Sequence, residues 1–333
     1  MSIIEKINLN NKLKVLGLII PFLTVSVWAQ NTDEGIVKAI RDLETACNSN
    51  DSQFAEYCFL VGKYYSLINT EKDKKLYKKT VNYFNKACSL NHFEACEVLG
   101  GYYEYGFYSV SEDLDKAANY YDKACKGENL SGCTSLGGLF LKEKYKKKDV
   151  SKAIELLSAT CKKEHHQACL KLAYYYDDDK LDKRDIGTAL SYFQKACDLG
   201  DSFACHELGK KYLEGVDVER NREKAKGYFR SGCLLKLGAS CFAIGKLQFI
   251  ENKFIEKETT RKPDWHSTRV YFESACYSEF GNAAGCNFLG YLTENGLGAR
   301  LDISKAKELY GRACDLGDQD GCDSYSRLSK EGL

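Results

Sequence analysis

Apolar residues recur three and four positions apart over short segments, and pairs of such segments repeat along most of the chain. One segment of each pair ends with two adjacent large residues, a small residue and a cysteine, as in residues 120–125 (YYDKAC). The next segment begins near a cysteine and continues with Leu-Gly and an aromatic residue, as in residues 133–140 (CTSLGGLF). This spacing places apolar side chains on one helix face. The pattern therefore predicts repeated pairs of amphipathic helices, each pair joined by a short turn.

Cysteines mark the repeat, because all 16 fall in pairs at nearly constant spacing. The pairs are Cys47 and Cys58, Cys88 and Cys96, Cys125 and Cys133, Cys161 and Cys169, Cys197 and Cys205, Cys233 and Cys241, Cys276 and Cys286, and Cys314 and Cys322. Successive pairs begin 36 to 43 residues apart, a period typical of a helical solenoid. We therefore expect residues 30–333 to form a single solenoid with about seven repeats and eight disulfide-linked pairs.

The first 29 residues have the features of a secretory signal peptide. Three lysines precede an uncharged apolar run over residues 15–27, and Ala29 stands where a signal peptidase would cut. Those 13 residues are too few to span a bilayer, which needs about 20. We predict cleavage after Ala29, a secreted or periplasmic location and no membrane anchor in the mature chain. Paired thiols in such compartments are normally oxidised to disulfides.

The repeat also predicts how the cysteines pair. In each unit the first cysteine ends one helix and the second begins the next, so the two lie across a tight turn where a disulfide can form. We predict that each cysteine is bonded to the other member of its pair, which contributes about 2.5 kcal/mol per loop in the chain-entropy model. Zinc sites favour shorter cysteine spacings with nearby histidines, so we expect no metal and no cofactor. We interpret His165 and His166 as a solvated helix end.

The consensus KAxxYYxKAC, a turn and ACxxLGxxYxxG resembles the Sel1-like repeats, which are relatives of tetratricopeptide repeats. It is most similar to the cysteine-rich Sel1-like proteins known from Helicobacter, over about residues 40 to 330. The resemblance implies an all-α fold: a right-handed α/α superhelical solenoid of Sel1-like helix pairs, each stapled by a disulfide. Two repeats depart from it, with Leu172-Ala173 and Tyr325-Ser326 in place of Leu-Gly.

The interval from Cys233 to Cys276 is the longest, at 43 residues, and includes the segment RKPDWH at 261–266. We interpret the extra residues as a surface loop that does not interrupt the stack. Most of the 23 tyrosines are expected in the core columns of the repeat, Tyr83, Tyr120, Tyr192 and Tyr228 among them, and not on a stacking platform for nucleobases or sugars.

Charge and motifs limit the classes of function. Forty-eight basic and 47 acidic residues leave a net charge of +1, so we expect no nucleic-acid partner. The resemblance implies one activity, weak hydrolysis or binding of β-lactams. Serine enzymes of that type carry S-x-x-K, S-D-N and K-T-G elements. Only an S-x-x-K is present, at residues 304–307, and we interpret Ser304 as a helix cap. The catalytic residues are therefore unknown.

A binding scaffold is the first of three hypotheses. The residues one and five positions after the second cysteine form a stripe that changes between repeats, as side chains lining a binding groove would. The candidate groove residues are Glu97, Thr134, Leu170, Tyr174, His206, Lys210, Phe242, Lys246, Asn287 and Tyr291. An unconstrained solvated face would vary in the same way. The partner would be a protein or peptide, a cell-wall fragment or a β-lactam, bound by a monomer. The other two hypotheses are the weak β-lactamase or penicillin-binding protein and an envelope component without a small-molecule site.

Overall fold

A computed structural model describes residues 33–49, 51–68, 73–107, 110–179, 184–258, 260–279 and 281–332, and every regular element in those ranges is helical. The chain divides into two compact units, Met1–Thr160 and Cys161–Leu333. The predicted signal peptide lies outside the described residues. The prediction of one solenoid over residues 30–333 stays a prediction, and each unit is described by itself.

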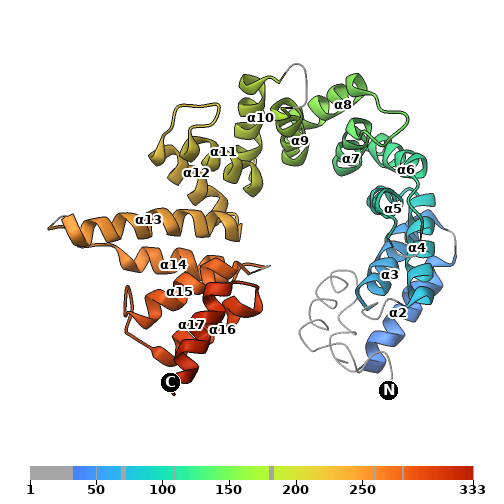
Figure 1. Cartoon of the computed structure of the whole chain (residues 1–333). Helices are drawn as coiled ribbons and strands as arrows, with labels where there is room; N and C mark the ends of the chain where they lie inside the picture. Colours follow the sequence, from blue (N-terminus) through green and yellow to red (C-terminus); the bar gives the residue numbers. More distant parts are fainter. Residues whose placement is uncertain are drawn as a thin grey trace. The chain divides into compact units, whose positions relative to one another are not determined.

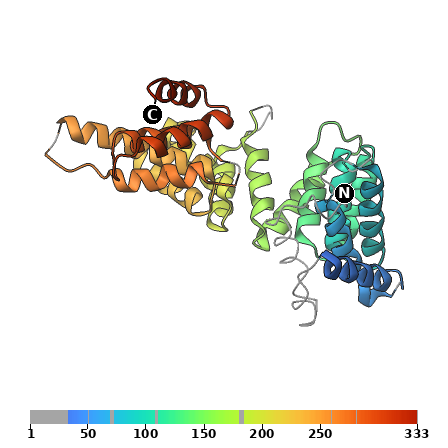
Figure 2. The ribbon, with the colours of Figure 1, turned by 90° about the horizontal axis from the view of Figure 1, so that it is seen from below.

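The helices alternate between two kinds within each unit (Figures 1 and 2). Even-numbered helices end at or near the first cysteine of a pair, and odd-numbered helices begin just before the second. The first unit contains α2 (Asp33–Cys47), η4 (Ser52–Phe54), α3 (Ala55–Ile68), α4 (Lys74–Ser89), α5 (Phe93–Tyr105), α6 (Leu114–Lys126), α7 (Leu130–Leu141) and most of α8 (Val150–Lys162). The second contains α9 (His166–Asp177), α10 (Ile186–Asp198), α11 (Ser202–Glu214), α12 (Arg222–Leu234), α13 (Gly238–Glu258), α14 (Trp265–Cys276), α15 (Ala283–Glu294), α16 (Ile303–Asp315) and α17 (Gln319–Lys330).

In the first unit α3 and α5 pack on the even helices before and after them, and in the second unit α11, α13 and α15 do the same. In α3, α5, α11, α13 and α15 the packing is close because a glycine faces a ring of the next even helix, whereas Gly137 of α7 faces Leu157 and α9 has Ala173 at this position. A Cβ placed on Gly209 would lie 2.6 Å from the ring of Phe229, and one on Gly100 would lie 2.4 Å from the ring of Tyr121. Both distances are far below van der Waals contact. The glycine of the recurring Leu-Gly step therefore allows close helix approach.

The core column of the even helices is one residue away from the predicted one. Phe84, Tyr121, Phe193 and Phe229 are almost fully buried, whereas the residues before them, Tyr83, Tyr120, Tyr192 and Tyr228, are only half-buried. Those four tyrosines stack on a tyrosine of the preceding odd helix, for example Tyr212 on Tyr228 at 5.5 Å. The prediction that they belong to the core is wrong. A phenol at this place keeps its hydroxyl at the surface of the helix pair, where it finds polar partners.

Even helices begin with an aspartate or asparagine that caps the first turn. Asp113 accepts a hydrogen bond from the backbone N–H of Lys116, Asn221 from that of Lys224, and Asp302 from that of Lys305. Such caps satisfy N–H groups that have no partner inside the helix. Ser304 is the second residue of α16, so the prediction that it caps this helix is wrong. The cap lies two positions earlier.

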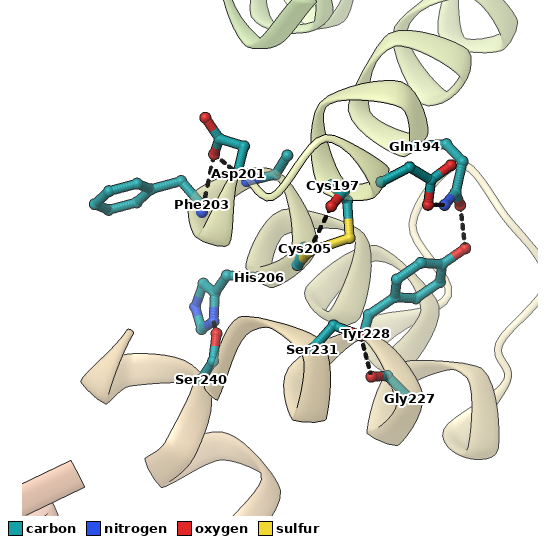
Figure 3. The surroundings of a disulfide bond; sticks show 12 residues. Gln194, Cys197, Asp201, Phe203, Cys205, His206, Gly227, Tyr228, Ser231 and Ser240 are labelled. Atoms are coloured by element: carbon teal, nitrogen blue, oxygen red, sulfur yellow. Dashed lines mark hydrogen bonds between the residues drawn. A yellow bond between two sulfur atoms is a disulfide. The ribbon is translucent and has the colours of Figure 1, made fainter. Parts of the chain in front are cut away.

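All eight cysteine pairs are disulfides within their own turns, with Cα atoms 4.5 to 4.9 Å apart. This is the neighbour-with-neighbour pairing that the repeat predicts. Figure 3 shows Cys197 and Cys205 bridging the turn from α10 to α11. Each bridge fixes one helix pair, and in α3, α5, α11, α13 and α15 a glycine–ring contact joins that pair to the next.

The longest repeat interval is taken up mainly by a longer helix. α13 has 21 residues, whereas α11 and α15 have 13 and 12. α14 packs along α13, and α15 follows in the same order, so the stack continues through this part of the second unit. The interpretation of the extra residues as a surface loop is therefore correct for residues 260–264 only, because the others lengthen α13.

Candidate functional site

The predicted stripe on the odd helices separates into two columns with different environments. The first column consists of the residues immediately after the second cysteine: Glu97, Thr134, Leu170, His206, Phe242 and Asn287, all buried or half-buried. The second set of positions lies four residues further along each odd helix, five residues after the second cysteine, and we name it the fifth column. It consists of glycine in α5 and α7, and of Tyr174, Lys210, Lys246 and Tyr291 in α9, α11, α13 and α15.

First-column side chains mostly contact the adjacent repeat. His206 Nδ1 lies 3.0 Å from Ser240 Oγ of the following turn, as Figure 3 shows. Asn287 donates from Nδ2 to Asp318 Oδ1 at 2.8 Å. The ring of Phe242 packs 5.8 Å from that of Phe288. Variation in this column therefore follows the local contact between neighbouring repeats.

Glu97 shows how strongly the first column is enclosed. Burial raises the pKa of its carboxyl group, and the nearby charges of Glu94 and Glu104 raise it further, against a hydrogen bond with Ser135 that lowers it. A carboxylate in such surroundings is more easily protonated than an exposed one. In α5 the first column therefore provides a partly enclosed acid, Glu97, and the fifth-column residue of the same helix is Gly101.

The fifth column of the second unit is open to solvent, and we name Tyr174, Lys210, Lys246 and Tyr291 the Tyr-Lys column. Tyr174 is 46% exposed and Tyr291 36% exposed, and 45% of the Lys210 side chain is accessible. Lys246 is exposed as well. Four consecutive odd helices thus present one long polar or aromatic side chain each at the same helical position.

Neighbours hold these side chains in place. The ring of Tyr174 meets Phe193 edge-on at 5.2 Å. Burial, followed by the charge of Glu207, raises the pKa of Tyr174 to about 12, so its hydroxyl stays protonated and can donate a hydrogen bond at neutral pH. Lys210 pairs with Glu207 at 3.0 Å, and Lys246 lies over the ring of Phe242 at 5.9 Å. The column combines phenols with lysines.

A buried ion cluster fixes α9 and α11 beside this column. Lys211 Nζ lies 3.0 Å from Asp177 and 2.9 Å from Asp217, and Arg184 contacts the same two carboxylates. Burial opposes the charge of Lys211, but the hydrogen bonds to Asp217 and Asp177 raise its pKa overall. The sequence does not predict this cluster, because its members are up to 40 residues apart and do not recur at the same position of other repeats.

A hydroxyl and an imidazole come together at Ser240 and His206, a combination that could in principle activate a nucleophile. Burial lowers the pKa of His206, which favours the neutral ring. However, Ser240 is 0% exposed, because its side chain fills the space above Gly232. A substrate has no access to this hydroxyl, and the pair serves packing between repeats.

The second unit also contains a cleft of about 690 Å³ at its hairpin edge. Its walls come from the turns at residues 233–239 and 274–282, with Phe203 at one side. Phe203 is 59% exposed and extends away from the disulfide in Figure 3. The cleft lies at the turns and not on the Tyr-Lys column. Its charged lining residues, Lys236 and Glu279, do not form a nucleophile with a base.

The histidines form contacts within the repeats. His166 Nδ1 lies 2.8 Å from Asp201, and His92 Nε2 lies 2.8 Å from Glu56. His165 and His166 do stand at the start of α9, but the second is paired across repeats and not simply solvated. Within the described ranges, no three histidine, cysteine or acidic side chains are arranged to hold a metal ion, and no helix there is long and apolar enough to cross a bilayer.

Known proteins share this architecture. Two solved structures align over most of the chain: a protective antigen of uropathogenic Escherichia coli strains with an SLR fold (22% identity, TM-score 0.58, 88% of this chain and 60% of that one) and a Sel1 repeat protein from Oxalobacter formigenes (20% identity, TM-score 0.57, 80% and 99%). At this identity they show the fold alone.

An uncharacterized protein of Haemophilus influenzae is 53% identical over 30 residues, which cover 9% of this chain and 58% of that protein. The chain thus spans about three fifths of the length of this relative and of the Escherichia coli antigen.

The sequence model of the Sel1 repeat matches residues 55–92, 93–129, 131–165, 166–201, 202–237 and 283–318. Each matched segment combines one odd helix with the even helix after it. These segments cover more than half of the 333 residues, and the chain therefore belongs to the Sel1 repeat family.

Proposed function

We propose that the protein is an exported, disulfide-stapled scaffold that binds an extended protein or peptide segment along the Tyr-Lys column of the second unit. The observation that carries this proposal is the alignment of Tyr174, Lys210, Lys246 and Tyr291 on four consecutive odd helices. Repeat proteins recognise partners through such columns, in which side chains vary while the core stays constant.

The chemistry of the column suits a peptide with acidic and polar groups. Tyrosine supplies a rigid aromatic surface with a hydrogen-bond donor, and it is enriched among the residues that dominate interface energetics. Lysines at the rim favour association with carboxylates. Lys210 is already paired with Glu207 at 3.0 Å, so an acidic partner group would have to compete with that carboxylate.

Export is the second part of the proposal. Eight disulfides in one chain are typical of an oxidising compartment outside the cytoplasm. The apolar run before Ala29 has the length and flanks of a cleaved signal. Weak β-lactam hydrolysis is not part of the proposal, because the hydroxyl that lies beside an imidazole, that of Ser240 beside His206, is closed to a substrate.

Peptide display against the oxidised protein tests the binding face. Selected peptides would be measured on the parent and on variants Tyr174→Ala and Lys210→Ala, with Lys305→Ala as control. Lys305 pairs with Glu308 three residues away at 2.8 Å, as Lys210 pairs with Glu207, but it lies on the even helix α16. We expect a loss of about tenfold or more in affinity from the two column variants and none from the control. Equal affinities for all four proteins would contradict the proposed face.

Export is tested separately by expressing the full chain in a Gram-negative host and sequencing the amino terminus of the product. The expected product starts at Gln30 and is recovered from the periplasm or the medium with no free thiols. A cytoplasmic product that retains Met1 would contradict export and leave the binding test unaffected.

A further inference from the structure

Three aromatic rings surround one ammonium group in the second unit. Lys253 Nζ lies 5.2 Å from the ring centroid of Trp265, 5.7 Å from that of Tyr291 and 5.8 Å from that of Phe249. A cation within about 6 Å of an aromatic face is attracted by the ring quadrupole. Here one cation meets that condition for three rings from three helices, α13, α14 and α15. We name Phe249, Trp265 and Tyr291 the aromatic cage.

The rings stand as separate walls and not as a flat stack. Phe249 is inclined by 65° to Trp265 at a centroid distance of 5.5 Å, and by 72° to Tyr291 at 5.8 Å. A carboxylate stands beside them: Trp265 donates from Nε1 to Glu256 Oε1 at 2.7 Å, and Glu256 lies 3.6 Å from Lys253. Aromatic walls with an adjacent carboxylate form the kind of site that recognises organic ammonium ions.

The walls are held by contacts that do not involve Lys253. Asn252 is 2% exposed; its Nδ2 donates to the carbonyl oxygen of Asp264 at 2.8 Å, and its Oδ1 accepts from the N–H of Asp264 at 3.0 Å. Asp264 directly precedes Trp265, so the start of α14 is fixed to α13. Phe249 also packs edge-on against Phe288 at 5.3 Å. The cage is therefore organised before any ligand arrives, which reduces the entropy cost of binding.

Lys253 differs from the walls in its freedom to move. Its side chain is 36% exposed and ends a flexible four-carbon stem, so the ammonium can leave the cage for water without disturbing the rings. We propose that the aromatic cage is a binding site for an organic ammonium ion, and that Lys253 occupies it in the absence of a ligand. The ligand is either a small quaternary ammonium compound or the lysine side chain of a bound polypeptide. This inference does not depend on the proposed scaffold function.

The indole of Trp265 provides the measurement. The chain contains two tryptophans, so a background with Trp28→Phe leaves Trp265 as the single tryptophan, whose emission is followed with excitation outside the tyrosine absorption band. Choline, N-acetyl-lysine amide and the neutral choline analogue 3,3-dimethylbutan-1-ol would be titrated against this protein and against its Lys253→Ser variant. Removal of an internal competitor raises the apparent affinity by the reciprocal of the fraction of cages that the competitor left open. We expect Lys253→Ser to tighten binding of at least one cation by about tenfold.

Two variants make the test specific. Lys224→Ser is the matched control, because Lys224 lies over one ring only, Tyr212 at 5.1 Å, and stands on α12, outside the aromatic cage and the Tyr-Lys column; it should leave the affinity unchanged. Tyr291→Leu in the Lys253→Ser background should abolish saturable binding. Circular dichroism and the melting temperature establish that each variant is folded.

The pattern of ligands identifies the source. Tighter binding of choline assigns the cage to quaternary ammonium compounds, and tighter binding of N-acetyl-lysine amide assigns it to lysine side chains. Both results support an ammonium site. Equal binding of the neutral analogue would overturn the proposal in favour of a simple apolar pocket. A folded Lys253→Ser protein without any saturable fluorescence change would also overturn it.

Discussion

Tyr121 donates its hydroxyl hydrogen to Glu104 over 2.5 Å, from α6 to the odd helix before it. The carboxylate is 5% exposed and is also paired with Lys142. The same arrangement recurs in the second unit, where Tyr310 donates to Glu294 at 2.7 Å and Arg327 contacts that glutamate. Where the core ring of an even helix is tyrosine instead of phenylalanine, the preceding odd helix supplies a glutamate as the acceptor.

Tyr121→Phe should lower the free energy of unfolding by about 1–3 kcal/mol, because it removes the hydroxyl donor from the buried Glu104 and leaves Lys142 as the remaining partner. Urea denaturation of the oxidised protein measures the change. The double variant Tyr121→Phe with Glu104→Leu should recover most of the loss, since Leu213 stands at the equivalent place opposite Phe229. Additive losses in the double variant would contradict the coupling between the two side chains.

Gly209→Ala tests the contact that joins one helix pair to the next. The new methyl group would lie 2.6 Å from the ring of Phe229, and such overpacking typically costs about 1–3 kcal/mol. Gly227→Ala is the control, because this glycine lies in α12 with no atom within 4 Å of an added Cβ. The control should be neutral or stabilising by up to about 1 kcal/mol. Thermal denaturation measures the change in melting temperature of both variants. Similar changes for the two substitutions would argue against the contact between Gly209 and Phe229.

Replacing Cys197 and Cys205 together by alanine should destabilise the protein by about 2–3 kcal/mol, the chain-entropy value for so short a loop. The effect should be concentrated in α10 and α11, because a repeat protein is stabilised by nearest-neighbour terms. Amide hydrogen exchange would show faster exchange in these two helices than in α16 and α17. Uniformly faster exchange over all the helices of the second unit would instead indicate one cooperative unit.

The repeat period and the disulfide turns could be predicted from sequence because they are local. A cysteine at the end of one helix and another eight residues later, as at Cys197 and Cys205, can scarcely pair otherwise once the turn is tight. The glycine position of Gly209 is also visible in the sequence, because glycine recurs there in several repeats. The recurrence indicates that these repeats share one requirement, a helix surface without a side chain.

Other features depend on single repeats and leave no periodic signal. The buried column at Phe229 could not be distinguished from its neighbour Tyr228, since helix spacing alone does not fix the rotation of a helix to within one residue. The ion cluster around Lys211 and the cage around Lys253 unite residues from several elements. Their side chains are brought together only by the stacking, so the sequence gives no indication of them.

His206 should make the stability of the second unit sensitive to pH. Burial lowers the pKa of its ring, and the charge of Lys210 lowers it further, although Glu207 acts in the opposite direction. The folded chain therefore binds this proton less readily than the unfolded chain. The contribution of His206 to stability is fully present above the ordinary histidine pKa of 6.5, and it falls as the pH is lowered from there towards the pKa of the folded state.

Urea unfolding at pH 7.5 and 5.5 should show less acid destabilisation for His206→Gln than for the parent. His266→Gln, at an exposed position in α14, should behave as the parent does, and an unchanged pH response in His206→Gln would show that the ring does not carry the effect.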